Sequence, residues 1–302
     1  MKGLKFKRRT VEEWLLGTPA IEGAVLYEDD SLTDGERRML ILFTEEETSY
    51  HCLRLPEEMG NLVQVQLSLD RLKAAPFRYE DRDLVHWLRK GELLKDSCQT
   101  VSEWRGQLDA CAGLMKDKLL LTEFCRFYRH YLRSKQELEQ QQLLDSFENL
   151  LQALHHWARL AVVEEGHYPD RSVWEQVRKE NVGVFKLYEE LTASAESLLK
   201  RIQLVLLASD FCVVSKLSGS SAYLLKLLES RDEPWGLQEL DTELGGAGLT
   251  DELVLLLNQL EKKALIKEVL TPFDEELAVM ERKFFRSLDQ NMERLQTPAT
   301  FL

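Results

Sequence analysis

A single long apolar helix constrains the fold of this chain more than any other segment. Residues 143–166, with the sequence LLDSFENLLQALHHWARLAVVEEG, repeat apolar side chains at intervals of three and four, which is the spacing of one helix face. His156 is expected on the opposite, polar side of this helix. So broad an apolar stripe must be covered by other helices, for which residues 119–132 and 196–214 are the candidates. The sequence therefore predicts a helical bundle in the middle of the chain.

Length and composition limit the classes of protein to which the chain can belong. Its 302 residues are enough for more than one core, and no apolar run approaches the ~18 residues that a membrane span needs. A formal net charge of −13 argues against broad nucleic-acid binding, because phosphate backbones attract clustered lysine and arginine. The basic start MKGLKFKRR is followed by no apolar signal segment, and the five cysteines show no CxxC spacing. We expect a cytoplasmic protein with reduced thiols and no membrane contact.

The first hundred residues alternate between strand patterns and helix patterns. Residues 38–44 form a nearly continuous apolar run, as in a buried strand, and residues 62–69 alternate polar and apolar side chains, as in a half-buried strand. Further strands are expected at residues 23–28, 47–55 and 92–95. Helices are expected at residues 10–17, from a cap at Ser68 or Asp70 to near Pro76, and at residues 81–90, which Gly91 ends. The pattern predicts a small α+β domain over residues 1–99.

The remainder of the chain is predicted to be almost entirely helical. Residues 100–216 have the pattern of a helical bundle domain, and KLSGSS at residues 216–221 has the small polar residues of a linker. Residues 217–271 then follow the order of three short helices and a terminal β segment, which is typical of a winged helix-turn-helix. Residues 272–302 are expected to form a charged helical tail.

The charge of the predicted winged helix argues against a DNA-binding role. Residues 217–271 carry five basic against ten acidic residues, which leaves a net charge of −5. The helix in the recognition position begins with Thr250, Asp251 and Glu252, where contacts to phosphates and base edges would be made. We therefore expect this module to pack against its own chain, to bind a protein partner or to self-associate, with DNA binding disfavoured.

Three segments of the chain resemble the bacillus-type nucleotidyltransferase-like proteins. HWLRKGELLKDS (residues 86–97) is similar to the strand that closes many nucleotidyltransferase domains. LLQALHHWARLAVVEEGHYPDRSVWEQV (150–177) and KLYEELTASAESLLKRIQLVLLASDF (186–211) are similar to the helical substrate-binding domain of that family. The resemblance covers nearly the whole chain. It implies a bacterial protein with a nucleotidyltransferase-like domain, a helical substrate-binding domain and a winged helix, in that order.

The resemblance implies metal-dependent nucleotidyl transfer, and the residues that this chemistry needs can be sought directly. The reaction uses a Gly-Ser turn for the triphosphate, two carboxylates one residue apart and a third on a neighbouring strand, which together hold two Mg²⁺ ions. At the corresponding places the sequence has Glu28-Asp29, Arg37-Arg38, and Gln64 with Gln66. We therefore expect a catalytically degenerate protein, a pseudoenzyme with no catalytic residue, metal or cofactor.

Two alternatives to a degenerate protein stay open. Asp29, Asp34 and Glu36 lie close to the altered positions and could form a rearranged carboxylate site, in which case the protein would be an active nucleotidyltransferase with Mg²⁺ as its cofactor. The other alternative is a transcription regulator that uses the winged helix, against which the local charge speaks.

Several arginines are candidates for binding a nucleotide or another anionic small molecule. Arginines of the helical domain could line a cleft between the first two domains and accept such a ligand. The alternative is that they are solvated or paired with acidic residues of the chain itself. His155 and His156 are adjacent on a helix and point about 100° apart, so they cannot chelate one metal ion together. The candidate ligand-binding residues are Arg37, Arg38, Arg126, Arg129, Arg159 and His156.

Overall fold

A computed structural model of the chain describes two compact units, one within residues 1–110 and one within residues 111–302. The described residues are 15, 18, 20–29, 37–44, 49–54, 61–274 and 279–286. Among them, the side chains of residues 29, 37, 38, 52–54, 61 and 274 are not part of the description. The helix expected at residues 10–17, apart from Leu15, and the candidate carboxylates Asp34 and Glu36 lie outside the described residues.

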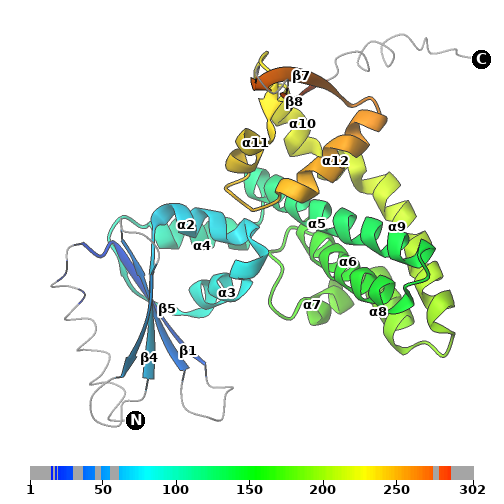
Figure 1. The fold of residues 1–302 in the computed structure, drawn as a ribbon. Coiled ribbons are helices and arrows are strands. Elements are labelled where there is room, and N and C mark those ends of the chain that lie inside the picture. Colours follow the sequence, from blue (N-terminus) through cyan, green and yellow to red (C-terminus); the bar gives the residue numbers. More distant parts are fainter. Residues whose placement is uncertain are drawn as a thin grey trace, which may run out of the picture. The chain divides into compact units, whose positions relative to one another are not determined.

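The first unit contains a five-stranded mixed sheet with the strand order β3-β4-β2-β1-β5. Figure 1 shows this sheet next to the helices of the same unit. β2 and β4 run parallel, and the other neighbouring strands are antiparallel. The strands are β1 (Gly23–Asp29), β2 (Arg37–Phe43), β3 (Ser49–Arg54), β4 (Asn61–Leu67) and β5 (Glu92–Asp96). They match the apolar and alternating runs of the sequence, and the expected α+β class is confirmed.

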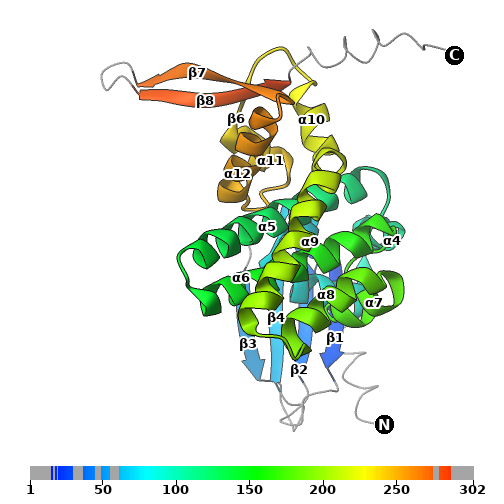
Figure 2. The same ribbon diagram turned by 90° about the vertical axis from the view of Figure 1, so that its right-hand side faces the viewer.

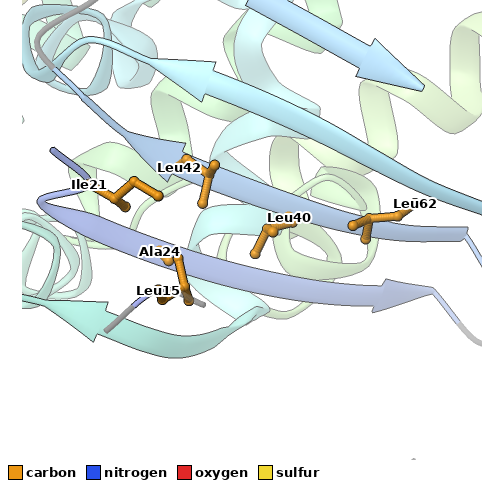
Figure 3. Close-up of a cluster of buried hydrophobic side chains, with 6 residues drawn as sticks. All are labelled: Leu15, Ile21, Ala24, Leu40, Leu42 and Leu62. Atoms are coloured by element: carbon orange, nitrogen blue, oxygen red, sulfur yellow. The ribbon is translucent and has the colours of Figure 1, made fainter. Parts of the chain in front are cut away.

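Each face of this sheet is covered by apolar side chains. On one face, a cluster of fully or almost fully buried side chains joins β1, β2 and β4 (Figure 3): Leu15, Ile21, Ala24, Leu40, Leu42 and Leu62. On the other face, Tyr27 of β1 packs against His86 and Trp87 of helix α3. Within residues 61–110 the α-helices of this unit are α2 (Leu69–Ala74), α3 (Arg82–Lys90) and α4 (Thr100–Ala110).

Short-range signals fix the ends of two helices in the first unit. The Ser68 hydroxyl accepts a hydrogen bond of 3.2 Å from the backbone N–H of Arg71 and so caps α2. Gly91 ends α3, as expected, and a Cβ atom at this residue would lie 2.5 Å from Val25 Cγ1 and 2.7 Å from the Trp87 carbonyl oxygen. A side chain at position 91 would therefore collide with the sheet and with the helix that it follows.

The second unit begins with a bundle of five helices around α6. The bundle consists of α5 (Gly113–Glu139), α6 (Leu143–Glu164), α7 (Val173–Glu180), α8 (Val182–Ala193) and α9 (Leu198–Ser220). α6 packs against the four other helices, which confirms the long central helix and its coverage by helices. One detail was wrong: His156, expected on a polar side, is buried, because α5 covers that side of α6 as well and supplies a carboxylate to it. Within the described residues, no helix combines the length and apolarity that crossing a membrane requires.

The C-terminal part of the second unit combines three helices with a small antiparallel sheet of order β6-β8-β7 (Figure 2). The hairpin of β7 and β8 is long, and β8 also pairs with the two-residue strand β6. The elements are α10 (Ala222–Leu228), β6 (Trp235–Gly236), α11 (Leu237–Glu243), α12 (Thr250–Lys262), β7 (Ile266–Asp274) and β8 (Val279–Arg286).

Two expectations for this region were wrong. The KLSGSS segment is not a linker, because α9 continues through it to Ser220 and places Ser218 and Gly219 on its exposed side, where small residues need no packing partner. Where a helical tail was expected from residue 272, β7 runs on to Asp274 and residues 279–286 form β8, because β8 pairs along its length with β7 and buries Phe284. Residues 287–302 lie outside the description.

Candidate functional site

The positions at which the metal-binding carboxylates of a nucleotidyltransferase are expected lie in the sheet of the first unit. The parallel register of β2 and β4 sets Gln64 beside Leu40 and Gln66 beside Leu42. Since neighbours in register point to the same face of a sheet, both glutamines share the face of the cluster in Figure 3. The antiparallel register of β1 and β2 sets Glu28 opposite Arg38 and Asp29 opposite Arg37.

Neutral amides occupy the third-carboxylate positions of this face. Both glutamines are half-buried, and Gln66 accepts a hydrogen bond of 2.8 Å from the Ser49 hydroxyl through its Oε1 atom. An amide oxygen can ligate a cation but contributes no negative charge to it, whereas Mg²⁺ is usually held through one or two carboxylates. The two positions therefore lack the charge on which two-metal chemistry depends.

Of the rearranged carboxylate site predicted from Asp29, Asp34 and Glu36, the structure describes only the backbone of Asp29. Among the described side chains, no group of three or more histidine, cysteine, aspartate or glutamate residues lies close enough to hold a metal ion. Asp29 is the last residue of β1 and its side chain is not described, and Asp34 and Glu36 fall between β1 and β2. A site built from these three residues stays a prediction.

In the second unit, the candidate residues of the helical domain gather around one buried carboxylate, Glu123 of α5. The Glu123 side chain is 1% exposed, and it accepts hydrogen bonds from Arg159 Nε at 2.7 Å and from His156 Nδ1 at 2.8 Å. His156 and Arg159 are three residues apart on α6 and so lie on the same side of that helix. This arrangement joins α5 to α6 through a fully enclosed ion pair and a histidine.

The protonation states of this cluster follow from its burial and its charges. Burial by itself would raise the pKa of Glu123, but the Arg159 guanidinium and the hydrogen bond with His156 outweigh burial and hold that pKa well below its usual range. Burial lowers the pKa of His156 to about 4, against the opposing effect of Glu123. At neutral pH the cluster therefore contains an ionised Glu123, a charged Arg159 and an uncharged His156.

A second polar contact extends the cluster along α5 and α6. The ring of His130 stacks on that of His156, with 5.7 Å between centroids and 10° between planes. His130 Nδ1 lies 3.0 Å from Asn149 Oδ1, and the Asn149 amide donates to Glu137 at 2.9 Å. Burial lowers the pKa of His130 as well. The two helices are thus joined by a ladder of polar side chains that runs from Arg159 to Glu137.

Further cations of α5 bind the C-terminal part of the same unit. Arg129 Nη1 donates to Glu252 of α12 at 2.5 Å, and the Glu252 side chain is buried. Lys118 Nζ donates to the Glu243 carbonyl at 2.6 Å, and Arg126 Nη2 lies 3.4 Å from the Ala247 carbonyl oxygen. α12 therefore packs on α5 through the acidic turn at its own N-terminus.

The structure places the six predicted ligand-binding residues in two groups. Arg126, His156 and Arg159 surround Glu123, and Arg129 lies one turn further along α5. Arg37 and Arg38 lie in β2 of the other unit, without described side chains. Arg129 and Arg159 are paired with carboxylates of the chain itself. Such pairing was the alternative to ligand binding in the sequence analysis.

Sequence reasoning missed the two acidic residues that organise this site, Glu123 and Glu252. For Glu123 a signal was present, because it is a lone carboxylate within the apolar run LLLTEFCRF at residues 119–127. A charge in such a run must find an internal partner if the segment is buried. Glu252 gave no comparable signal, since an acid in the first turn of a helix is favourable even when fully exposed.

Comparisons with known proteins agree with this architecture. Residues 117–216 match the family model of the YgxA-like substrate binding domain. The uncharacterized protein YgxA of Bacillus subtilis is 34% identical over 186 residues, which are 62% of this chain and 63% of that protein. The chain thus aligns with less than two thirds of this relative's length.

A solved structure extends the similarity over nearly the whole chain. It is the crystal structure of a nucleotidyltransferase-like protein from Exiguobacterium sibiricum, with a TM-score of 0.75 and 26% sequence identity. The match covers 93% of this chain and 98% of that one. The chain therefore has a nucleotidyltransferase-like fold and contains a YgxA-like substrate-binding domain, as the resemblance of its sequence implied.

Proposed function

We propose that this chain is a catalytically degenerate nucleotidyltransferase-like protein that binds a nucleotide or another small anion without transferring it. The observation that carries the proposal is that two neutral side chains, Gln64 and Gln66, lie beside Leu40 and Leu42 of β2, at the β4 positions where a third metal-binding carboxylate is expected. Arg37 and Arg38 support it, because cationic side chains in the paired-carboxylate positions repel a metal ion and attract an anion.

The residues proposed to bind the anion belong to two sets that can be tested separately. Arg37 and Arg38 begin β2, and since successive residues of a strand belong to opposite faces of the sheet, one of the two is proposed to contact phosphate oxygens in place of a metal ion. Arg126 is proposed as the contact of the helical domain, while Arg129, Arg159 and His156 hold α5, α6 and α12 in place through Glu252 and Glu123. These last three are positioning residues in this proposal.

The proposal is tested by assaying transfer and binding on the same variants. In the presence of Mg²⁺, no nucleotide should be transferred or hydrolysed above the blank, and the Asp34→Ala variant should behave like the unchanged protein. Replacing Arg37 and Arg38 with glutamine, singly and together, should show that one of the two weakens ATP binding by about tenfold or more, since it removes a charge-assisted hydrogen bond. Arg82→Gln, on an exposed arginine of the same unit, is the matched control and should leave binding unchanged. Mg²⁺-dependent turnover that Asp34→Ala abolishes would establish the active transferase instead.

A second role concerns the C-terminal part of the second unit. The order α10-β6-α11-α12-β7-β8 and the sheet order β6-β8-β7 support the prediction of a winged helix at residues 217–271, to which β8 adds a further strand. Because Glu252 in the first turn of α12 is buried against Arg129, we propose that this helix serves contacts within the protein or with a protein partner. Fluorescence anisotropy with duplex DNA should then show no binding that weakens steeply with salt, whereas such binding would favour a transcription regulator.

A further inference from the structure

The solvent-facing side of α9 is apolar over its middle turns. Leu204, Leu207, Phe211 and Val214 are 49%, 55%, 70% and 77% exposed. We call these four residues the α9 stripe. The other exposed positions of α9 from residue 203 onward are Gln203, Ser215, Ser218 and Gly219, none of which is charged. A helix whose outer face meets water normally carries charged and polar residues there. Figure 2 shows α9 in front of α5 and α6, with its outer side toward the viewer.

The spacing of the α9 stripe matches a helix partner. Its members follow one another at intervals of three, four and three residues, which is the seam along which two helices pack. The spacing is also symmetric about Ser209. A second α9 that runs antiparallel would therefore bring Leu207 against Phe211 of the other copy, and Leu204 against its Val214. From this self-complementarity we propose that a second copy of the chain docks on the α9 stripe and forms a symmetric dimer.

The apolar area exposed by the α9 stripe is large enough for a dimer interface. Each side chain of the α9 stripe exposes on the order of 100 Å², so two copies bury roughly 800–1,000 Å² from the stripe alone, close to the ~1,000 Å² at which specific interfaces begin. Leu199, five residues before Leu204 on the same helix, is also exposed. An interface of this size is modest, and a dissociation constant on the order of 10 µM is expected.

The charge beside the centre of the α9 stripe does not oppose pairing. Asp210 is held within its own chain, where Lys135 Nζ donates to it at 2.9 Å and the Tyr131 hydroxyl also donates to it. Its negative charge is therefore balanced before a second copy arrives. Docking then buries apolar side chains without leaving an unpaired carboxylate at the seam.

Sedimentation velocity of the full chain between about 1 and 200 µM tests the dimer, a range that spans the expected dissociation constant. The unchanged chain should pass from monomer to dimer. Leu207→Glu should raise the dissociation constant at least about 100-fold, because a carboxylate would be buried at the seam. Leu144→Glu changes a leucine of α6 that is 75% exposed and lies outside the stripe, so it should dimerise like the unchanged chain. An unchanged chain that stays monomeric throughout, or a dimer that Leu207→Glu leaves intact, would overturn the proposal.

A charge-pair variant tests the antiparallel arrangement. In the double variant Leu207→Glu with Phe211→Lys, each glutamate would face a lysine of the other copy, and the dimer should be at least about tenfold tighter than in Leu207→Glu alone. A parallel pair would instead set glutamate against glutamate. A double variant that dimerises no better than the single one would contradict the antiparallel seam. The dimer does not depend on the proposed anion binding, so either idea can fail alone.

Discussion

Replacing Glu123 with glutamine should lower the free energy of unfolding of the second unit by about 3 kcal/mol, the lower end of the range for breaking a buried ion pair. Glu123 is 1% exposed and bonds both Arg159 and His156. Glutamine has almost the same volume, so the change removes charge without opening a cavity. The loss arises because the buried Arg159 guanidinium keeps its charge but loses the carboxylate that compensates it.

Urea unfolding of the full chain provides the assay, followed by tryptophan fluorescence, to which Trp157, almost fully buried on α6, contributes. The slope of free energy against urea should stay the same while the midpoint falls. Glu196→Gln is the matched control, because Glu196 pairs with Lys200 on the surface of the same unit at 3.0 Å. Its cost should stay below about 0.5 kcal/mol, since exposed pairs contribute little.

A double variant separates the ion pair from other effects of the substitution. Glu123→Gln combined with Arg159→Met removes both charges, so its cost should be clearly smaller than the sum of the two single costs. A Glu123→Gln variant that loses less than about 1 kcal/mol, comparable to a surface pair, would refute the reasoning. Strict additivity of the two substitutions would refute it as well.

Two further predictions concern pH and backbone packing. The pKa of His156 falls from 6.5 to about 4 on folding, so its contribution to stability is complete above pH about 6.5 and is lost as the pH falls toward 4, by at most about 3 kcal/mol. Urea titrations at several pH values measure the free energy of unfolding against pH. His156→Gln should flatten this curve between about pH 4 and 6.5, and an unchanged curve would contradict the prediction. Gly91→Ala should destabilise the first unit by about 1–3 kcal/mol, because the added Cβ lies 2.5 Å from Val25 Cγ1. A thermal melt tests this prediction. The control is Gly106→Ala, which should not lose stability, because a Cβ at that residue meets nothing within 4 Å.

The elements with strong local patterns could be predicted from the sequence. α6 follows from its three-and-four apolar spacing, and α3 follows from an amphipathic run that stops at Gly91. β2 follows from an apolar run that is buried throughout its described side chains. In each case the signal lies within the element itself, so no knowledge of the partner was needed.

The elements that depend on distant partners could not be predicted in this way. The sequence VMERKFFR of β8 has no clear alternation, and it becomes a strand because it pairs with β7 on one side and β6 on the other. α9 extends through KLSGSS because the buried Ser220 and Leu217 face the interior while the small residues face outward. Local propensity for a turn was overridden by packing.

The candidate site was predictable by residue type but not by pairing. The sequence singled out Arg126, Arg129, Arg159 and His156, and the structure places them along two facing helices. Which carboxylate each one meets depends on the rotation of α5 against α6 and on the docking of α12. No pattern within one helix contains that information, so the pairing of these cations with Glu123 and Glu252 could not be predicted.

Calorimetric titration of the full chain with ATP and with GTP, each in Mg²⁺ and in EDTA, tests the central claim most directly. A degenerate protein that binds the anion through arginines should bind the nucleotide in EDTA at least as tightly as in Mg²⁺, because the metal ion neutralises part of the phosphate charge that the arginines contact. Binding that requires Mg²⁺ would contradict the account, because it would mean that carboxylates near β1 and β2 still hold a metal ion.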